Sequence, residues 1–196
     1  MDLRPQDRSA LELAAELVDS ISPGQLDLPT PCGPWRLDDL LRHMVSQNKR
    51  FAAAALGTDL DAAAPLEGGE LDGGPAAAFR ASVREVTAGF AADGPADRTV
   101  VMPELPGPMP VSAAVGFHFT DFLVHGWDVA RALGAPFAPP AELTRAALAL
   151  AERIPDGARR PGGPFGPIAE TGPDADPFDL LLGLTGRRPD WKAAGG

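Results

Sequence analysis

The chain has a single cysteine, Cys32, among its 196 residues, so no disulfide can form within it. It also has no run of about 18 apolar residues, the length that a helix needs to span a membrane. Residues 1–8 lack the apolar core of a signal peptide. These absences exclude a disulfide-framed secreted fold and a helical membrane protein, and they predict a cytoplasmic protein.

Positive charge is also scarce. The 17 Lys and Arg residues face 27 Asp and Glu residues, which gives a formal net charge of −10 and an isoelectric point near 4.7. A nucleic acid would be repelled by that field unless a local basic patch overcame it, and the Arg pairs at 159–160 and 187–188 are too small. We therefore expect a small-molecule partner, with neither nucleic acid nor membrane as a partner.

The length and composition are those of one globular domain over residues 1–196, with 44% apolar and 22% charged residues. Apolar residues recur at helical spacing in several segments. The expected helices are 7–21, 37–56, 75–92, 112–133 and 141–153, with a short helical piece at 178–184. We expect Ser112 to cap the fourth helix and Gly134 to end it. Residues 57–75 look like a surface loop, and the proline-rich stretch 98–110 like a small irregular hairpin. The pattern predicts an all-α helical bundle.

The expected helix 112–133 is apolar on nearly all sides, which is typical of a helix inside a protein. Its one polar stripe runs through His118, Asp121, His125 and Asp128. This stripe faces either water or an internal cavity. A solvated face is the more common arrangement, but the other helices of this chain use Arg, Glu and Asp there. Two of the three histidines, with an aspartate between them, favour the cavity.

Asp121 and His125 are spaced i and i+4, so their side chains project in parallel and can bind one ion. His43 lies in the second expected helix, and an antiparallel bundle would place it opposite that pair. Two imidazoles and a carboxylate are a common ligand set for a catalytic divalent metal, zinc first. The pattern thus suggests His43, Asp121 and His125 as metal ligands and catalytic residues, although His43 alone would be read as a core or surface histidine. His118 is left as a fourth ligand, a partner of a ligand, or a cavity wall.

Other residues near these segments have simpler interpretations. We expect Cys32 to be a small buried packing residue, since thiols are among the most buried side chains. Asp128 is either a hydrogen-bond acceptor for His125 or the partner of an arginine. Arg36 cannot cap the second helix, so either Asp38, Asp39 or the preceding turn satisfies its first amides, or the helix start is frayed by about 1 kcal/mol. Trp191 is expected to attach the C-terminal segment to the bundle.

Three segments together resemble a known family. They are Pro29-Thr-Pro-Cys-Gly-Pro-Trp35 with Leu40-Leu-Arg-His43, Asp121-Phe-Leu-Val-His-Gly-Trp-Asp-Val-Ala-Arg131, and Gly186-Arg-Arg-Pro-Asp-Trp191. They are similar to the actinobacterial metal-binding branch of the DinB-like fold, related to the N-terminal domain of mycothiol-dependent maleylpyruvate isomerase. The resemblance implies an up-and-down four-helix bundle with a long crossover, and metal ligands at His43, Asp121 and His125. Some relatives have Glu or His at position 121, so the shorter Asp121 implies a metal nearer this helix or bound more weakly.

The resemblance also implies a chemistry. The expected cation is zinc, with nickel and manganese as alternatives. A divalent cation bound by one carboxylate and two neutral histidines gives the site a net charge of about +1. That charge favours an anion at the open coordination position, such as a thiolate, hydroxide or enolate. Enzymes of the family use a metal and a low-molecular-weight thiol, mycothiol in actinobacteria. We therefore expect a thiol transferase or isomerase that acts on a small electrophile. A non-catalytic metal or small-molecule binding protein and a thiol-independent enzyme of a biosynthetic pathway remain alternatives, and a homodimer is left open.

Overall fold

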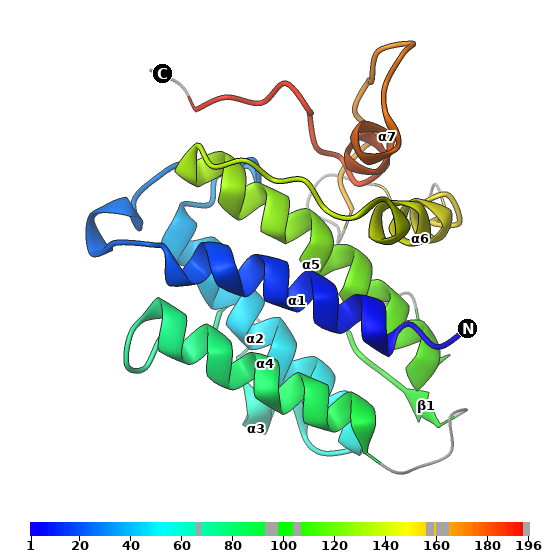
Figure 1. Ribbon diagram of the computed structural model, residues 1–196. Coiled ribbons are helices and arrows are strands. Elements are labelled where there is room, and N and C mark those ends of the chain that lie inside the picture. Colours follow the sequence, from blue (N-terminus) through cyan, green and yellow to red (C-terminus); the bar gives the residue numbers. More distant parts are fainter. Residues whose placement is uncertain (66–67, 93–97, 104–106, 156–158, 160–164, 194–196) are drawn as a thin grey trace.

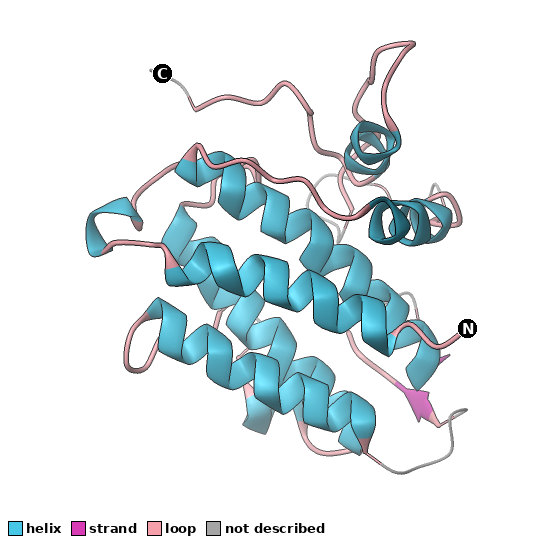
Figure 2. Ribbon diagram, in the orientation of Figure 1, coloured by secondary structure: helices cyan, strands magenta, loops and turns pink. Residues whose placement is uncertain are grey.

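The computed structural model describes residues 1–65, 68–92, 98–103, 107–155, 159 and 165–193. Helices make up nearly all of its regular structure (Figure 2), as the all-α expectation required. The helices are α1 (Arg4–Asp19), η1 (Pro23–Gln25), α2 (Leu37–Leu56), α3 (Leu60–Ala63), α4 (Pro75–Ala91), α5 (Val111–Leu133), α6 (Ala141–Ala151) and α7 (Pro177–Leu184). Strands β1 (Thr99–Val100) and β2 (Met109–Pro110) form the expected small hairpin. In the described part of the chain, no helix has the length and apolarity needed to cross a bilayer.

Four helices, α1, α2, α4 and α5, form the bundle (Figure 1). Helix α1 runs parallel to α5 and α2 runs parallel to α4, while α2 is antiparallel to α5. Contacts between residue pairs show these directions. For α1 and α5 the pairs are Asp7–His118 and Ala14–Gly126, and for α2 and α4 they are Asn48–Ser82 and Ala52–Gly89. For the antiparallel α2 and α5 they are His43–His125 and Asn48–His118. Parallel neighbours that follow one another in the chain need a long connection, and residues 57–74 supply the expected crossover from α2 to α4.

Helix α5 has the central position in this arrangement. It packs on α1 and α2 on one side and on α6 on the other, and most of its residues are buried, which explains why its sequence is apolar on nearly all sides. Helices α6 and α7 lie together beside α5, outside the four-helix bundle (Figure 1). A second apolar cluster fills the space between these helices and α5, and Trp191 packs against it, as expected.

Some helix boundaries differ from the expected ones. Helix α1 begins at Arg4 because Pro5 is tolerated in the first turn of a helix. The prediction that Ser112 caps the fourth helix is wrong. Helix α5 begins at Val111, whose amide donates to the Arg98 carbonyl, so the hairpin fixes the start of the helix and Pro110 holds the capping position.

The expected loop 57–75 contains one short helix, α3. The guanidinium of Arg50, which is 1% exposed, holds it by donating to Asp61 and to the carbonyls of Leu60 and Ala64. The hydrogen bonds and the ion pair of one buried arginine thus hold part of a segment whose sequence has little helical periodicity.

The start of α2 is capped by Asp39 and the preceding turn, so the alternative of a frayed start is wrong, and the Arg36 side chain takes no part. The Asp39 carboxylate accepts the backbone N–H of Arg36 at 2.9 Å. The preceding turn accepts the next two amides, through the carbonyls of Leu28 and Leu26. These bonds satisfy donors that would otherwise be orphaned at the helix start.

Candidate metal centre

The antiparallel pair of helices α2 and α5 brings His43, Asp121 and His125 together. Their potential ligand atoms all lie within 4.8 Å of one another. The rings of His43 and His125 have centroids 5.2 Å apart in an edge-on arrangement, and Nε2 of His125 is 3.4 Å from Oδ1 of Asp121. Zinc ligands about 2 Å from a shared ion lie up to ~4 Å apart, so small side-chain rotations would suffice to hold a divalent cation here.

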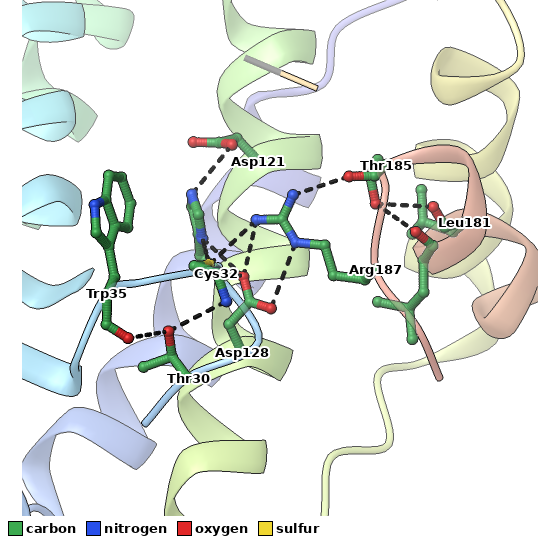
Figure 3. Close-up of polar contacts among 10 residues, drawn as sticks. Thr30, Cys32, Trp35, Asp121, Asp128, Leu181, Thr185 and Arg187 are labelled. Carbon is green, nitrogen blue, oxygen red and sulfur yellow. Dashed lines mark hydrogen bonds and ion pairs between the residues drawn. The ribbon is translucent and has the colours of Figure 1, made fainter. Parts of the chain in front are cut away.

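The group lies at the edge of the bundle rather than in its centre. The Asp121 side chain is 32% exposed, while that of His125 is 5% exposed. The indole of Trp35 covers His43, with ring centroids 4.7 Å apart. The elbow before α2 positions that indole, because the Thr30 hydroxyl donates to the Trp35 carbonyl and accepts the Cys32 amide (Figure 3). The open side of the group is therefore the side of Asp121.

The two histidines of the group have opposite protonation tendencies. Burial, together with the neighbouring His125, lowers the pKa of His43 to about 4, so His43 is neutral at physiological pH. Burial also opposes a charge on His125, but the Asp121 carboxylate and the hydrogen bond to Asp128 outweigh it and raise the pKa of His125 to about 10. A cation that binds Nε2 of His125 must therefore displace a proton.

Asp128 holds the other nitrogen of His125. Its carboxylate oxygen lies 3.0 Å from Nδ1 of His125, and the same oxygen accepts from the Arg187 guanidinium at 3.0 Å (Figure 3). Both roles that the sequence left open for Asp128 are thus present at once. Burial opposes ionisation of Asp128, but the Arg187 charge and the bond from His125 outweigh it and lower its pKa to about 2.

Cys32 packs against the main apolar cluster, as expected, and its thiol also belongs to this polar cluster. The thiol donates to Asp128 at 2.9 Å and lies 3.7 Å from Nδ1 of His125. Burial and the Asp128 charge raise the pKa of Cys32. Cys32, His125 and Asp128 form a second group whose ligand atoms lie within 4.8 Å of one another. The two groups share His125, and each uses a different ring nitrogen.

Arg187 is the residue that sequence reasoning missed. It reaches the cluster from the segment after α7, 59 positions along the chain from Asp128. Gly186 makes this approach possible, since it has φ +82° and a Cβ there would lie 2.8 Å from the Cα of Gly166. The closing Gly-Arg-Arg motif was the available signal, but it carries no information about which arginine turns inward.

His118 is not part of the centre, although it lies on the same stripe of α5. It is fully buried, with Nδ1 2.6 Å from the Asp7 carboxylate and Nε2 3.0 Å from Oδ1 of Asn48. The amide nitrogen of Asn48 donates to Ser82, so its oxygen faces the imidazole. Both nitrogens of His118 are engaged, and this side chain connects α1, α2 and α5 instead of serving as a fourth ligand.

The fold and this group of donors define a helical bundle with a candidate metal site between two antiparallel helices. The family model of the mycothiol maleylpyruvate isomerase N-terminal domain matches residues 8–130. The chain belongs to that family, as the resemblance implied. Two uncharacterized proteins of Mycobacterium tuberculosis, MT0763 of strain CDC 1551 / Oshkosh and Rv0738 of strain ATCC 25618 / H37Rv, are each 32% identical to it over 191 residues. The alignments cover 95% of this chain and 100% of each relative. No solved structure gives a significant match.

Proposed function

We propose that this protein is a metal-dependent enzyme that transfers a low-molecular-weight thiol to a small electrophile, or isomerises that electrophile with the thiol as cosubstrate. Mycothiol is the thiol we propose and the cytoplasm the compartment. The metal ligands are His43, Asp121 and His125, and zinc is the proposed cation, with nickel and manganese as alternatives. One observation carries the proposal: these three donors gather at the bundle edge in a member of this family.

The chain's own residues fit a divalent cation. His43 is neutral and offers a lone pair, because its pKa is about 4. Asp128 fixes the orientation of His125 through Nδ1, which leaves Nε2 for the ion. Asp121 is the one carboxylate of the group, so the bound site keeps a net charge of about +1, which favours an anionic ligand. When bound, such a cation acts as a Lewis acid that lowers the pKa of a thiol or water.

The exposure of Asp121 determines where a substrate enters. The open side of the donor group is next to this partly exposed carboxylate, while Trp35 and the Asp128–Arg187 pair close the other sides. The thiol and the electrophile would therefore meet on the Asp121 side, close to the solvent. His125, fixed by its bond to Asp128, keeps its geometry while ligands exchange there.

The test combines metal binding with turnover. Purified protein is offered zinc, nickel and manganese, and its metal content is measured; turnover of a panel of electrophiles, maleylpyruvate included, is then followed with and without mycothiol. We expect one bound metal and thiol-dependent turnover, both lost in His125→Ala and Asp121→Ala. Glu16→Ala, an exposed carboxylate on α1, is the matched control and keeps both.

Other outcomes assign the alternatives. Metal binding without turnover would indicate a binding protein, and turnover that needs the metal but no thiol would indicate a thiol-independent enzyme. A protein that stays metal-free in excess zinc, nickel and manganese contradicts the proposal.

A further inference from the structure

Two overlapping donor groups compete for one cation in this structure. The first is His43, Asp121 and His125, and the second is Cys32, His125 and Asp128. In the first group His125 faces Asp121 with Nε2, and in the second it faces Asp128 and Cys32 with Nδ1. The second group contains the thiol and the more deeply buried carboxylate. Zinc, a borderline-soft cation, binds thiolate, imidazole and carboxylate ligands alike, so donor chemistry alone does not exclude this group.

The Arg187 guanidinium lies on the second group. One terminal nitrogen is 3.0 Å from Oδ2 of Asp128 and 3.4 Å from the sulfur of Cys32, so it donates toward two of the three donors (Figure 3). Arginine keeps its charge at any physiological pH. A cation bound among these atoms would lie beside that fixed charge and would lose the Asp128 oxygen to it.

Arg187 is held in place from the other end of its guanidinium as well. Its other terminal nitrogen donates to the Thr185 carbonyl at 2.9 Å. The Thr185 hydroxyl in turn donates to the carbonyls of Leu181 and Leu182, at the end of α7. The side chain is only 14% exposed. It is therefore a built part of the site rather than a surface arginine that happens to lie near it.

We propose that Arg187 selects which donor group takes the metal. Its guanidinium puts a positive charge beside Cys32 and Asp128, where a cation of the second group would bind, and so excludes that cation. The Cys32 thiol then stays a donor to Asp128. The metal is directed to the first group, His43, Asp121 and His125. Arg187 is a positioning residue, and this role rests on the proposed function. It lies beyond residues 8–130, the part that matches the family model, so the segment after α7 completes the site.

Cobalt(II) tests this role without any measurement of activity. A thiolate ligand gives cobalt an intense near-ultraviolet charge-transfer band, which imidazole and carboxylate ligands do not produce. We expect the wild-type cobalt protein to lack that band and Arg187→Met to show it. The band should disappear again in Arg187→Met with Cys32→Ser, and Arg187→Lys, which keeps the charge, should resemble the wild type. Arg188→Met is the matched control, since Arg188 is exposed and pairs with Asp190.

The outcomes separate this inference from the function on which it rests. A thiolate band in wild-type protein, or its absence in a folded Arg187→Met protein that binds cobalt, overturns the inference and leaves the metal site standing. If Arg187→Met does not fold, Cys32→Ser decides: we expect unchanged cobalt affinity, and a loss of more than about tenfold overturns the inference. A flat cobalt and zinc titration of the wild type contradicts the proposed function itself.

Discussion

Replacing Asp128 with Asn is the sharpest perturbation of the cluster behind the candidate site. The Asp128 side chain has no exposed surface and accepts from Cys32 at 2.9 Å, from His125 at 3.0 Å and from Arg187 at 3.0 Å. Asp128→Asn keeps the shape, removes the charge and leaves Arg187 without its buried partner. Breaking a buried ion pair by removing one partner costs about 3–5 kcal/mol. Because Arg187 keeps 14% exposure and its bond to Thr185, we expect the lower end, about 3 kcal/mol.

Urea unfolding followed by circular dichroism measures this loss, which corresponds to a fall in Tm of roughly 6–12 °C for a chain of this size. A zinc titration against a chelator should also show affinity reduced about 10–100-fold, because His125 loses the acceptor that orients it. Asp190→Asn, which removes the exposed partner of Arg188, is the control and should change stability by less than about 0.5 kcal/mol. A loss below about 1 kcal/mol in Asp128→Asn, indistinguishable from the control, would refute the reasoning.

Three further predictions follow from other parts of the structure. His118→Leu should lose about 2–4 kcal/mol of unfolding free energy, since it removes the imidazole that pairs with the buried Asp7 carboxylate. The variant should keep its zinc affinity. A loss of affinity equal to that of His43→Ala would contradict the separation of His118 from the centre. Zinc binding at pH 7 should release about one proton, because the pKa of His125 is raised to about 10. Zinc affinity should therefore fall about tenfold for each pH unit below that value. Calorimetry in buffers of different ionisation enthalpy measures the proton release, and no release would contradict the prediction. Gly186→Ala should cost about 1–3 kcal/mol, because φ is +82° and a Cβ would approach Gly166, and thermal unfolding at wild-type temperature would contradict it.

Local patterns were sufficient for the long helices, though not for α3, and for two of the three residues of the candidate site. The i, i+4 spacing of Asp121 and His125 places both on one face of α5 whatever the rest of the chain does. The position of His43 depends on the direction of α2 relative to α5, which no local pattern contains. An antiparallel bundle was the assumption that placed His43 opposite the pair, and the family resemblance implied the same ligand. Helix periodicity also predicted α2 to its last residue, because Gly57 adopts a left-handed conformation that ends it.

The remainder depends on contacts between distant segments. His118 shares the stripe of His125, yet Asp7 on α1 and Asn48 on α2 take up its nitrogens, so one stripe serves both the site and the core. Arg187 enters from the segment that follows α7, a helix that packs on α6, while its sequence neighbour Arg188 is exposed to solvent. The sequence around Cys32 is typical of a buried packing residue, but the elbow also places its thiol within hydrogen-bond distance of Asp128. The spacing of residues along the sequence does not contain these contacts between distant segments.

The position of a bound metal tests the central claim most directly. A crystal of the zinc-loaded protein, with anomalous scattering measured on both sides of the zinc edge, locates the ion without reference to activity. We expect one peak about 2.0–2.2 Å from ligand atoms of His43, Asp121 and His125, with Arg187 still paired to Asp128. A peak among Cys32, His125 and Asp128, or none near His43, would contradict it.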